Sequence, residues 1–223
     1  MTTVSVVVHS GNGHTKVIAE AIARGARSVE GVHVHLFEVS PAQVGPDGRW
    51  RDDAIMATLD VSDAILFGCP TWMGSVSSPF KAFMEATFAL WFEQRWKDKF
   101  ASGFTNSASQ SGDKLSSLMQ LSIFAAQLSM IWVPIGDPPG NNWTGGSVTD
   151  VNRLGSWLGL MSQSNGDQGP EVSPPVSDRI TAERHGRRVT LIARKWRHGI
   201  AYETERYREA LREDASGWVE GTK

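Results

Sequence analysis

The sequence has few of the features that mark secreted, membrane-spanning or nucleic-acid-binding proteins. Its single cysteine, Cys69, cannot form an internal disulfide, which favours a reducing compartment, and we expect the protein in the cytoplasm. No apolar run is long enough to cross a bilayer, and the amino terminus lacks the basic region of a signal peptide. With 22 lysines and arginines against 24 aspartates and glutamates, the chain has no excess positive charge to attract nucleic acid or an anionic membrane.

Metal binding is not expected either, because His9, His33, His35 and His185 lack ligand spacing with any cysteine or carboxylate. A basic run lies between positions 184 and 197, but acidic residues follow it closely. That pattern favours a solvated helix face over a nucleic-acid site.

The length of 223 residues, with 40% hydrophobic and 21% charged residues, is typical of one globular domain. We expect that domain to span 1–200 and a charged tail to span 201–223. Within the domain, the Pro- and Gly-rich segment 137–175 is too long for a plain connector. It is predicted to be an inserted functional or interface loop, and its Trp143 and Trp157 favour a homodimer or homotetramer.

Apolar patterning alternates between strands and helices along the chain. Short β-branched or apolar runs predict strands at 4–8, 32–37, 63–68, 100–105 and 130–133. Helical spacing predicts helices near 15–26, 55–59, 79–90, 115–124 and 179–197. The two histidines on one face of 32–37 suggest an edge strand. This order predicts an α/β fold with a doubly wound, five-stranded parallel sheet in a three-layer α/β/α arrangement. In such sheets ligands bind at the carboxyl ends of the strands.

The first strand runs into a turn that suits a phosphate group. Its residues are Ser10, Gly11, Asn12, Gly13, His14 and Thr15. Free N–H groups at the start of the following helix favour an anion there, and the glycines let the backbone approach closely. The dinucleotide fingerprint would need a glycine in place of Lys16, and a P-loop would need a Gly-Lys-Ser/Thr ending, so both alternatives fail. A helix cap without a ligand stays open as an explanation.

Two further turns offer groups that suit a flat heteroaromatic ring such as a flavin. The second turn consists of Pro70, Thr71, Trp72, Met73 and Gly74, and places an aromatic ring and a thioether beside exposed backbone amides. The third, from Asn106 to Gly112, supplies hydroxyl and amide groups. Taken alone, Trp72 and Met73 are better explained as core or interface residues, and the third turn as an ordinary polar loop.

Together these segments resemble a known family. The spacing of 10–15, 67–74, 90–91, 105–107 and 133–136 is similar to that of the WrbA-type NAD(P)H:quinone oxidoreductases of the flavodoxin-like superfamily. The resemblance covers Thr3 to Gly136. It implies FMN as cofactor, a tetramer with active sites shared between subunits, and NAD(P)H and quinone alternating in one pocket.

The resemblance also assigns residues. It implies that FMN is held at its phosphate by residues 10–15, at its ring by residues 70–74, and at its pyrimidine side by Asn106, Ser107, Ala108, Ser109, Gln110 and Ser111. Gln127 stands where the family has a histidine near the flavin. Asn12, Trp72 and Trp91 are expected to contact the substrate, with ordinary helix packing as the alternative for Trp91.

Three functions fit an FMN site. The leading hypothesis is an enzyme that transfers two electrons, as hydride, from NADH or NADPH to a small-molecule quinone by a ping-pong mechanism. No catalytic side chain is expected, because the chemistry belongs to the flavin. The alternatives are a flavodoxin-type one-electron carrier, which would usually have a strongly acidic surface, and a flavin-binding interaction protein without turnover.

Overall fold

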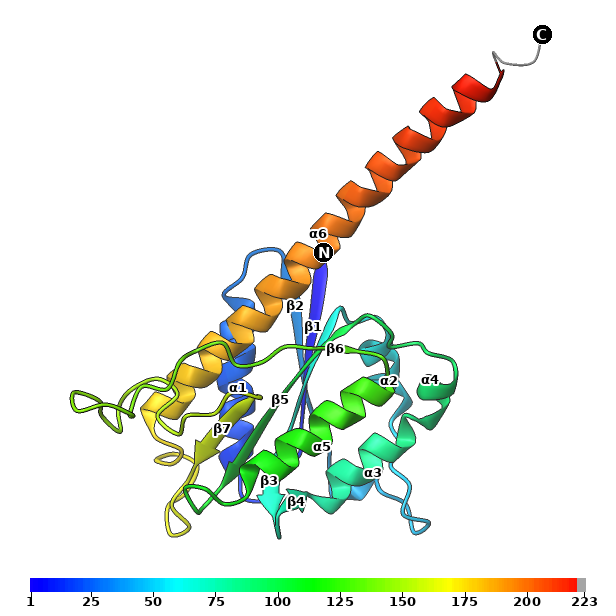
Figure 1. The fold of residues 1–223 in the computed structure, drawn as a ribbon. Coiled ribbons are helices and arrows are strands. Elements are labelled where there is room, and N and C mark those ends of the chain that lie inside the picture. Colours follow the sequence, from blue (N-terminus) through cyan, green and yellow to red (C-terminus); the bar gives the residue numbers. More distant parts are fainter. Residues whose placement is uncertain (220–223) are drawn as a thin grey trace.

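The fold is built on the parallel sheet that the sequence predicts (Figure 1). The computed structural model describes the backbone of residues 1–219 and the side chains up to residue 199. The five predicted strands are β1 (Thr2–Val8), β2 (Val32–Glu38), β3 (Ala64–Trp72), β5 (Phe100–Ser107) and β6 (Ile131–Trp132). They pair in parallel in the order β2-β1-β3-β5-β6, with β2 at the edge as predicted.

Two short strands extend the sheet beyond the five that were predicted, so it has seven. Strand β4 (Ser75–Val76) turns back antiparallel to β3, and β7 (Leu160–Gln163) pairs in parallel with β5. Phe100 pairs with Ile131 of β6, and Phe104, farther along β5, pairs with Leu160 of β7. The last position of the sheet is therefore filled by two pieces of chain. Residues 133–159 separate the two strands, and β7 lies within the predicted loop 137–175.

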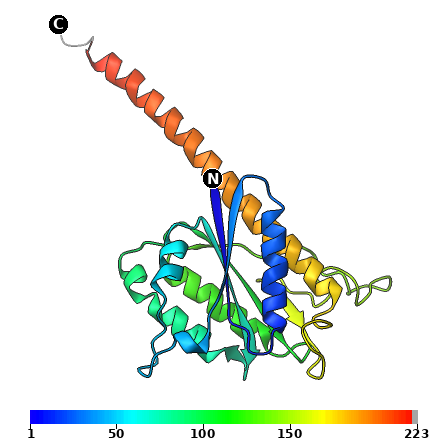
Figure 2. The ribbon, with the colours of Figure 1, turned by 180° about the vertical axis from the view of Figure 1, so that it is seen from behind.

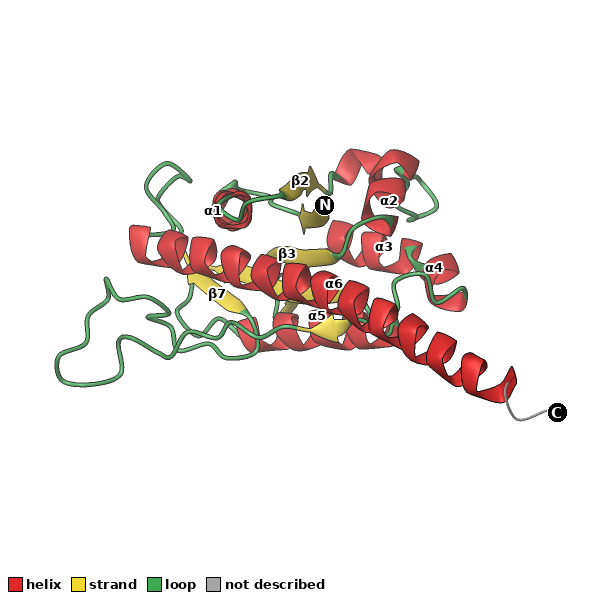
Figure 3. Ribbon diagram, turned by 90° about the horizontal axis from the view of Figure 1, so that it is seen from above, coloured by secondary structure: helices red, strands yellow, loops and turns green. Residues whose placement is uncertain are grey.

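Helices cover both faces of the sheet, which confirms the three-layer arrangement (Figure 3). One face carries α1 (His14–Arg27) and α6 (Val176–Val219). The other carries α2 (Asp53–Asp60), α3 (Ser78–Ala86), α4 (Phe88–Phe92) and α5 (Lys114–Gln127). A 3-10 turn at Pro41–Gln43 precedes α2. The helix predicted over 79–90 is two helices, because the chain leaves helical geometry at Thr87.

Strand β1 shows why its residues form a central strand. Val4, Val6 and Val8 pack in the cluster under α1 and α6, while Val7 packs in the cluster on the opposite face. Successive side chains of a strand point to opposite faces, so a run of valines fills both layers at once. Burial on both sides fixes β1 between β2 and β3, and its carboxyl end leads directly into the first turn.

Helices α1 and α6 pack closely through glycines (Figure 2). A Cβ on Gly25 of α1 would clash with the carbonyl of Glu183 on α6, and a Cβ on Gly186 would clash with the carbonyl of Ile22 on α1. The two backbones therefore approach at positions where neither has a side chain. This contact holds α1, and with it the first turn, against the sheet.

Helix α6 is longer than the predicted helix over 179–197. It continues to Val219, and its carboxyl-terminal part projects beyond the sheet (Figure 1). The expected boundary between domain and tail at residue 200 therefore falls within a continuous helix. Residues 220–223 of that tail lie outside the described part of the chain. No helix in the described part has an apolar stretch that could span a bilayer.

Candidate functional site

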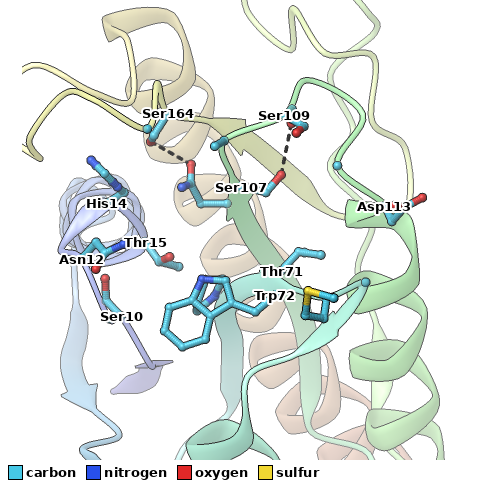
Figure 4. A pocket seen from close by; sticks show the side chains of 18 residues that line it. Ser10, Asn12, His14, Thr15, Thr71, Trp72, Ser107, Ser109, Asp113 and Ser164 are labelled. Carbon is cyan, nitrogen blue, oxygen red and sulfur yellow. Dashed lines mark hydrogen bonds between the residues drawn. The ribbon is translucent and has the colours of Figure 1, made fainter.

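A cavity of about 710 Å³ opens at the carboxyl ends of β1, β3 and β5 (Figure 4). The sheet order reverses between β1 and β3, which is where ligands bind in open α/β sheets. The volume of the cavity is in the range of small-molecule sites. The residues that line it are Ser10, Gly11, Asn12, His14, Thr15, Pro70, Thr71, Trp72, Met73, Gly74, Asn106, Ser107, Ala108, Ser109, Gly112, Asp113, Ser164 and Gly166.

The first turn presents backbone N–H groups to this cavity. Gly13, with φ of 85°, is the residue before α1, and the following N–H groups begin a helix whose first turn has no intrahelical acceptor. The Ser10 hydroxyl oxygen accepts the N–H of Lys16 at 3.2 Å and so closes the turn. Within the described residues, the N–H groups of residues 11–13 have no acceptor. Unused donors at a helix start are a ready site for an anion.

No lysine or arginine of the described part of the chain lines the cavity. Lys16, the nearest lysine in sequence, forms an ion pair with Glu38 at 2.8 Å, and this carboxylate raises the lysine pKa. His14 contacts the backbone oxygen of Gln168 at 2.8 Å through Nε2. An anion at the first turn would therefore be held chiefly by neutral donors and by the helix dipole.

The Trp72 indole forms an apolar wall of the cavity (Figure 4). It is 45% exposed, and His9 meets it edge-on with ring centroids 5.6 Å apart. A Cβ on Gly11 would clash with the indole, so this glycine makes room for the tryptophan. The first and second turns are thus in direct contact.

Met73 and Gly74 form the tip of the β3–β4 hairpin. Both have positive φ, 49° and 73°, between the paired residues Trp72 and Ser75. Two such residues in a two-residue loop are typical of a type I′ turn, which normally has asparagine or glycine at its first position. The Met73 side chain is fully exposed, so its thioether is free to meet a ligand at the rim of the cavity.

Thr71 and Asn106 belong to buried networks that fix their directions. The Thr71 hydroxyl lies 2.8 Å from those of Thr105 and Ser117, so its hydrogen is used inside the protein. The Asn106 Oδ1 accepts hydrogen bonds from the hydroxyls of Ser162 at 2.8 Å and Ser164 at 3.0 Å. With its oxygen occupied by these two donors, Asn106 has its NH₂ group free to donate to a ligand.

The cavity brings together most of the predicted site residues. Gly13, Gln110 and Ser111 do not line it, although their neighbours do. Gln127 and Trp91 are placed elsewhere: both line a second cavity with residues of α3 and α4, on the face of the sheet that α5 covers. Within one chain, Gln127 and Trp91 therefore do not lie at the first cavity, and their roles beside the flavin and the substrate stay predictions. Both residues were placed by resemblance alone.

Four lining residues were not among the predicted ligand contacts: Gly112, Asp113, Ser164 and Gly166. Gly112 is the last residue of the predicted third turn, and Asp113 follows it directly. Ser164 and Gly166 follow β7, whose pairing with β5 carries the inserted segment to the cavity. The polar stretch Ser162-Gln163-Ser164 was the only local signal, and such a stretch equally fits a loop.

Cys69 and His9 are two buried titratable groups near the site, and burial shifts the pKa of each. Burial raises the pKa of Cys69 to about 12, so the thiol stays protonated and unreactive. Burial lowers the pKa of His9, with Glu38 opposing it, and its Nδ1 lies 2.8 Å from the Ser77 hydroxyl. Among the residues with described side chains, no cluster of three or more His, Cys, Asp or Glu could hold a metal ion.

Comparison with known proteins decides the family. Residues 4–144 match the profile of the family described as NADPH-dependent FMN reductase. The chain belongs to this family. Its membership confirms an oxidoreductase of flavodoxin-like fold.

Individual relatives of this NADPH-dependent FMN reductase family member match over nearly their whole length. A protein named flavodoxin FldP, from Pseudomonas aeruginosa, is 39% identical over 190 residues, 85% of this chain and 96% of its own. A protein named NAD(P)H dehydrogenase (quinone), from Paracoccus denitrificans, is 31% identical over 201 residues, 86% of this chain and 94% of its own. The solved structure of a flavodoxin, WrbA-like protein from Agrobacterium tumefaciens is 36% identical, with a TM-score of 0.64, and the match covers 87% of this chain and 99% of that one. These similarities confirm the resemblance to the WrbA-type proteins.

Proposed function

We propose that this chain binds FMN in the cavity at the carboxyl ends of β1, β3 and β5 and transfers two electrons from NADH or NADPH to a quinone. When bound, the flavin supplies the redox chemistry. One observation carries the proposal: the first turn with its N–H groups, the indole of Trp72 and the amide of Asn106 all line the same cavity.

The first turn fits the phosphate of FMN. Its N–H groups have no acceptor among the described residues, and Gly13 adopts a positive φ that lets the backbone curl around an anion. The Ser10 and Thr15 hydroxyls line the same end of the cavity. A terminal phosphate monoester fits this turn better than the internal diphosphate of FAD, for which the fingerprint is missing.

The second and third turns fit the ring. The Trp72 indole offers a flat apolar surface for stacking, and Asn106 offers an NH₂ group that two serines hold in place. We propose that these residues orient the flavin and that the nicotinamide and the quinone stack on the exposed side of it. No side chain of the chain need gain or lose a proton in this scheme.

We also propose that both substrates use this cavity in turn, which gives a ping-pong mechanism. The described part of the chain contains one sheet, and no separate unit in it could bind a dinucleotide away from the flavin cavity. Initial rates over a grid of NADH and benzoquinone concentrations should give parallel double-reciprocal lines. Lines that intersect for every acceptor tried would show a ternary complex and would contradict the shared cavity.

A one-electron carrier is the second candidate, and the relative named flavodoxin FldP favours it. Against it stands the net charge of −2, since carriers usually dock through a strongly acidic surface. The FMN-loaded protein, mixed with NADPH and benzoquinone and with no partner protein, separates the two. Catalytic oxidation of NADPH supports the reductase, and its absence with either nicotinamide supports the carrier.

A homodimer or homotetramer is part of this proposal. Leu115, Met119 and Ile123 recur at four-residue spacing on α5, and each is about half exposed. Trp91 and Phe92 of α4 are exposed as well. An apolar stripe on a covering helix is typical of a surface buried in an assembly. In an oligomer, Trp91 and Gln127 would be available to the cavity of another subunit. A cytoplasmic location stays part of the proposal, since the lone cysteine suits a reducing compartment.

A further inference from the structure

We propose that Lys114, which lies behind the third turn and outside the cavity, is a positioning residue that sets the affinity and the redox potential of the bound flavin. This proposal deepens the proposed function and rests on it. Lys114 would act by holding the N–H groups of the third turn toward the cavity and by placing a positive charge beneath them.

The first observation is the burial of the Lys114 side chain. Lys114 is the first residue of α5, and it is 0% exposed. Its Nζ donates hydrogen bonds to the backbone oxygens of Ser109 at 2.6 Å and Gln110 at 2.7 Å. Lysines are almost never fully buried, because removing the ammonium from water is costly. The two carbonyl oxygens of the third turn offset part of that cost.

Gln163 of β7 holds a third carbonyl of the same turn. Its Nε2 donates to the oxygen of Ala108 at 2.9 Å. The side chain is held in turn by Arg153, whose guanidinium donates to Oε1 at 3.2 Å. Lys114 and Gln163 therefore bind three successive carbonyl groups, those of residues 108, 109 and 110.

The orientation of these carbonyls determines where the donors point. In a trans peptide the C=O of one residue and the N–H of the next point in opposite directions. With the carbonyls of residues 108–110 turned toward Lys114 and Gln163, the N–H groups of residues 109–111 point away from them. None of these N–H groups has an acceptor among the described residues, and Ala108 and Ser109 line the cavity. Of the three residues 109–111, Ser109 lines the cavity, so the third turn offers its N–H as a donor to a carbonyl oxygen of a bound ring.

The charge of Lys114 is not neutralised nearby. Asp178 of α6 is engaged by Arg153, with Nε–Oδ1 at 2.7 Å, and no carboxylate of the described residues forms an ion pair with Lys114. A cation at the start of a helix is also opposed by the helix dipole. Burial lowers the pKa of Lys114 to about 8. Asp178 raises this pKa and Arg153 lowers it, each by less than burial does. Helix stability alone therefore gives no reason for a lysine here.

This charge matters for a redox cofactor. Electrons added to a bound ring bring negative charge, and a buried cation stabilises negative charge more strongly than an exposed one does. Lys114 is thus expected to raise the midpoint potential of the flavin. The N–H donors that it orients act in the same direction, because hydrogen bonds to charged acceptors are stronger than those to neutral ones.

The test is a comparison of Lys114→Met with a matched control, Lys99→Met. Lys99 also donates to two backbone oxygens, those of Asp60 and Ser62, both at 2.7 Å, but it lies at the opposite end of the sheet. We expect Lys114→Met to raise the dissociation constant of FMN about tenfold or more, the factor that corresponds to one lost hydrogen-bonding interaction, and to lower the midpoint potential. Lys99→Met should change neither, although both variants lose the same kind of contact.

Gln163→Met and a pH series keep the test decisive if Lys114→Met folds poorly. Gln163→Met removes a contact to the turn but no charge, so FMN affinity should fall while the midpoint potential falls less than in Lys114→Met. For the wild type, FMN affinity should weaken as the pH rises through about 8, where Lys114 loses its proton. Its charged surroundings are Asp178 and Arg153, and the adjacent Asp113, which lines the cavity.

Two outcomes overturn the proposal and differ from each other. If wild type and Lys114→Met bind FMN with the same affinity and potential, Lys114 does not act on the flavin, and the proposed function stands. If the wild type binds no FMN at any pH, the proposed function fails and this inference fails with it.

Discussion

Ser10, Thr71 and Asn106 meet the cavity with polar groups whose directions neighbouring residues have already fixed. The Ser10 oxygen accepts a backbone N–H, the Thr71 hydroxyl is tied to Thr105, and the Asn106 oxygen is held by Ser162 and Ser164. Groups fixed before a ligand arrives lose little conformational entropy when it binds. At the scale of residues, the cavity is prepared for a neutral ring and one anionic group.

His185 makes the clearest pH-dependent contribution to stability. It is completely buried on α6, its Nε2 lies 2.8 Å from the Ser102 hydroxyl, and its Nδ1 has no hydrogen-bond partner among the described residues. Burial lowers its pKa from 6.5 to about 4. Below pH 6.5 the unfolded chain gains a proton that the folded chain does not, so stability is lost as the pH falls toward 4. The full loss is about 3 kcal/mol.

Urea unfolding at pH 7 and pH 5 measures this contribution. We expect His185→Gln to lose less stability between the two pH values than the wild type, because glutamine does not titrate. His33→Gln, at an exposed histidine of β2, should lose as much as the wild type. An equal loss in His185→Gln and wild type would show that His185 is not responsible.

The sequence predicted most of the cavity residues for a local reason. The first two turns follow β1 and β3 directly, so their place at the carboxyl edge follows from the strands alone. Ser164 and Gly166 reach the cavity only because β7 pairs with β5, more than fifty residues earlier in the chain. Gln127 and Trp91 were assigned by resemblance, and the structure places them in another cavity. The pairing of β5 with β7 joins segments far apart in the chain, and no local sequence pattern predicts it.

At the scale of elements, the sequence predicted the strands and helices of the sheet well and their interruptions poorly. Buried runs such as 64–69 have a strong apolar pattern, which identifies β3. The break at Thr87 and the two unpredicted short strands, β4 and β7, depend on tertiary contacts. Helix α6 continues beyond Arg197, where the predicted helix ended, because the sequence that follows contains no proline.

The contact between α1 and α6 gives a sharp prediction for Gly186→Ala. The added methyl group would clash with the Ile22 carbonyl, so the helices must separate. We expect Gly186→Ala to destabilise the protein by roughly 1–3 kcal/mol, as overpacking does. Gly199→Ala is the matched control on the same helix, because a Cβ there meets nothing within 4 Å.

Thermal unfolding of the two variants checks this prediction. Gly199→Ala should be neutral or slightly stabilising, since alanine favours a helix over glycine by about 1 kcal/mol. If Gly186→Ala were as stable as Gly199→Ala, the close approach of α1 and α6 would be wrong.

At the scale of the whole molecule, alternating strands and helices predicted a doubly wound parallel sheet, and the structure has the strand order β2-β1-β3-β5-β6. The fold class and the location of the cavity follow from that order. The state of assembly does not, because it depends on which exposed apolar residues meet a second chain. The stripe on α5 identifies one surface for that contact.

Met119→Glu tests the proposed assembly. A charge in the middle of a buried apolar interface is costly, so we expect the variant to shift from dimer or tetramer toward monomer at micromolar concentration. Val61→Glu is the control, at an exposed valine that ends α2. Light scattering reads the mass directly. A wild type that is monomeric, or a Met119→Glu variant that assembles normally, would show that α5 is not an interface.

One measurement tests the central claim most directly: an anaerobic titration of the FMN-loaded protein, followed by its visible absorbance. The account predicts that one equivalent of NADPH or NADH for each bound FMN bleaches the flavin, and that one equivalent of benzoquinone then restores the colour, with no other protein present. A flavin that neither nicotinamide can bleach, although FMN is bound in the cavity, would contradict the assignment of this chain as an NAD(P)H-dependent quinone reductase.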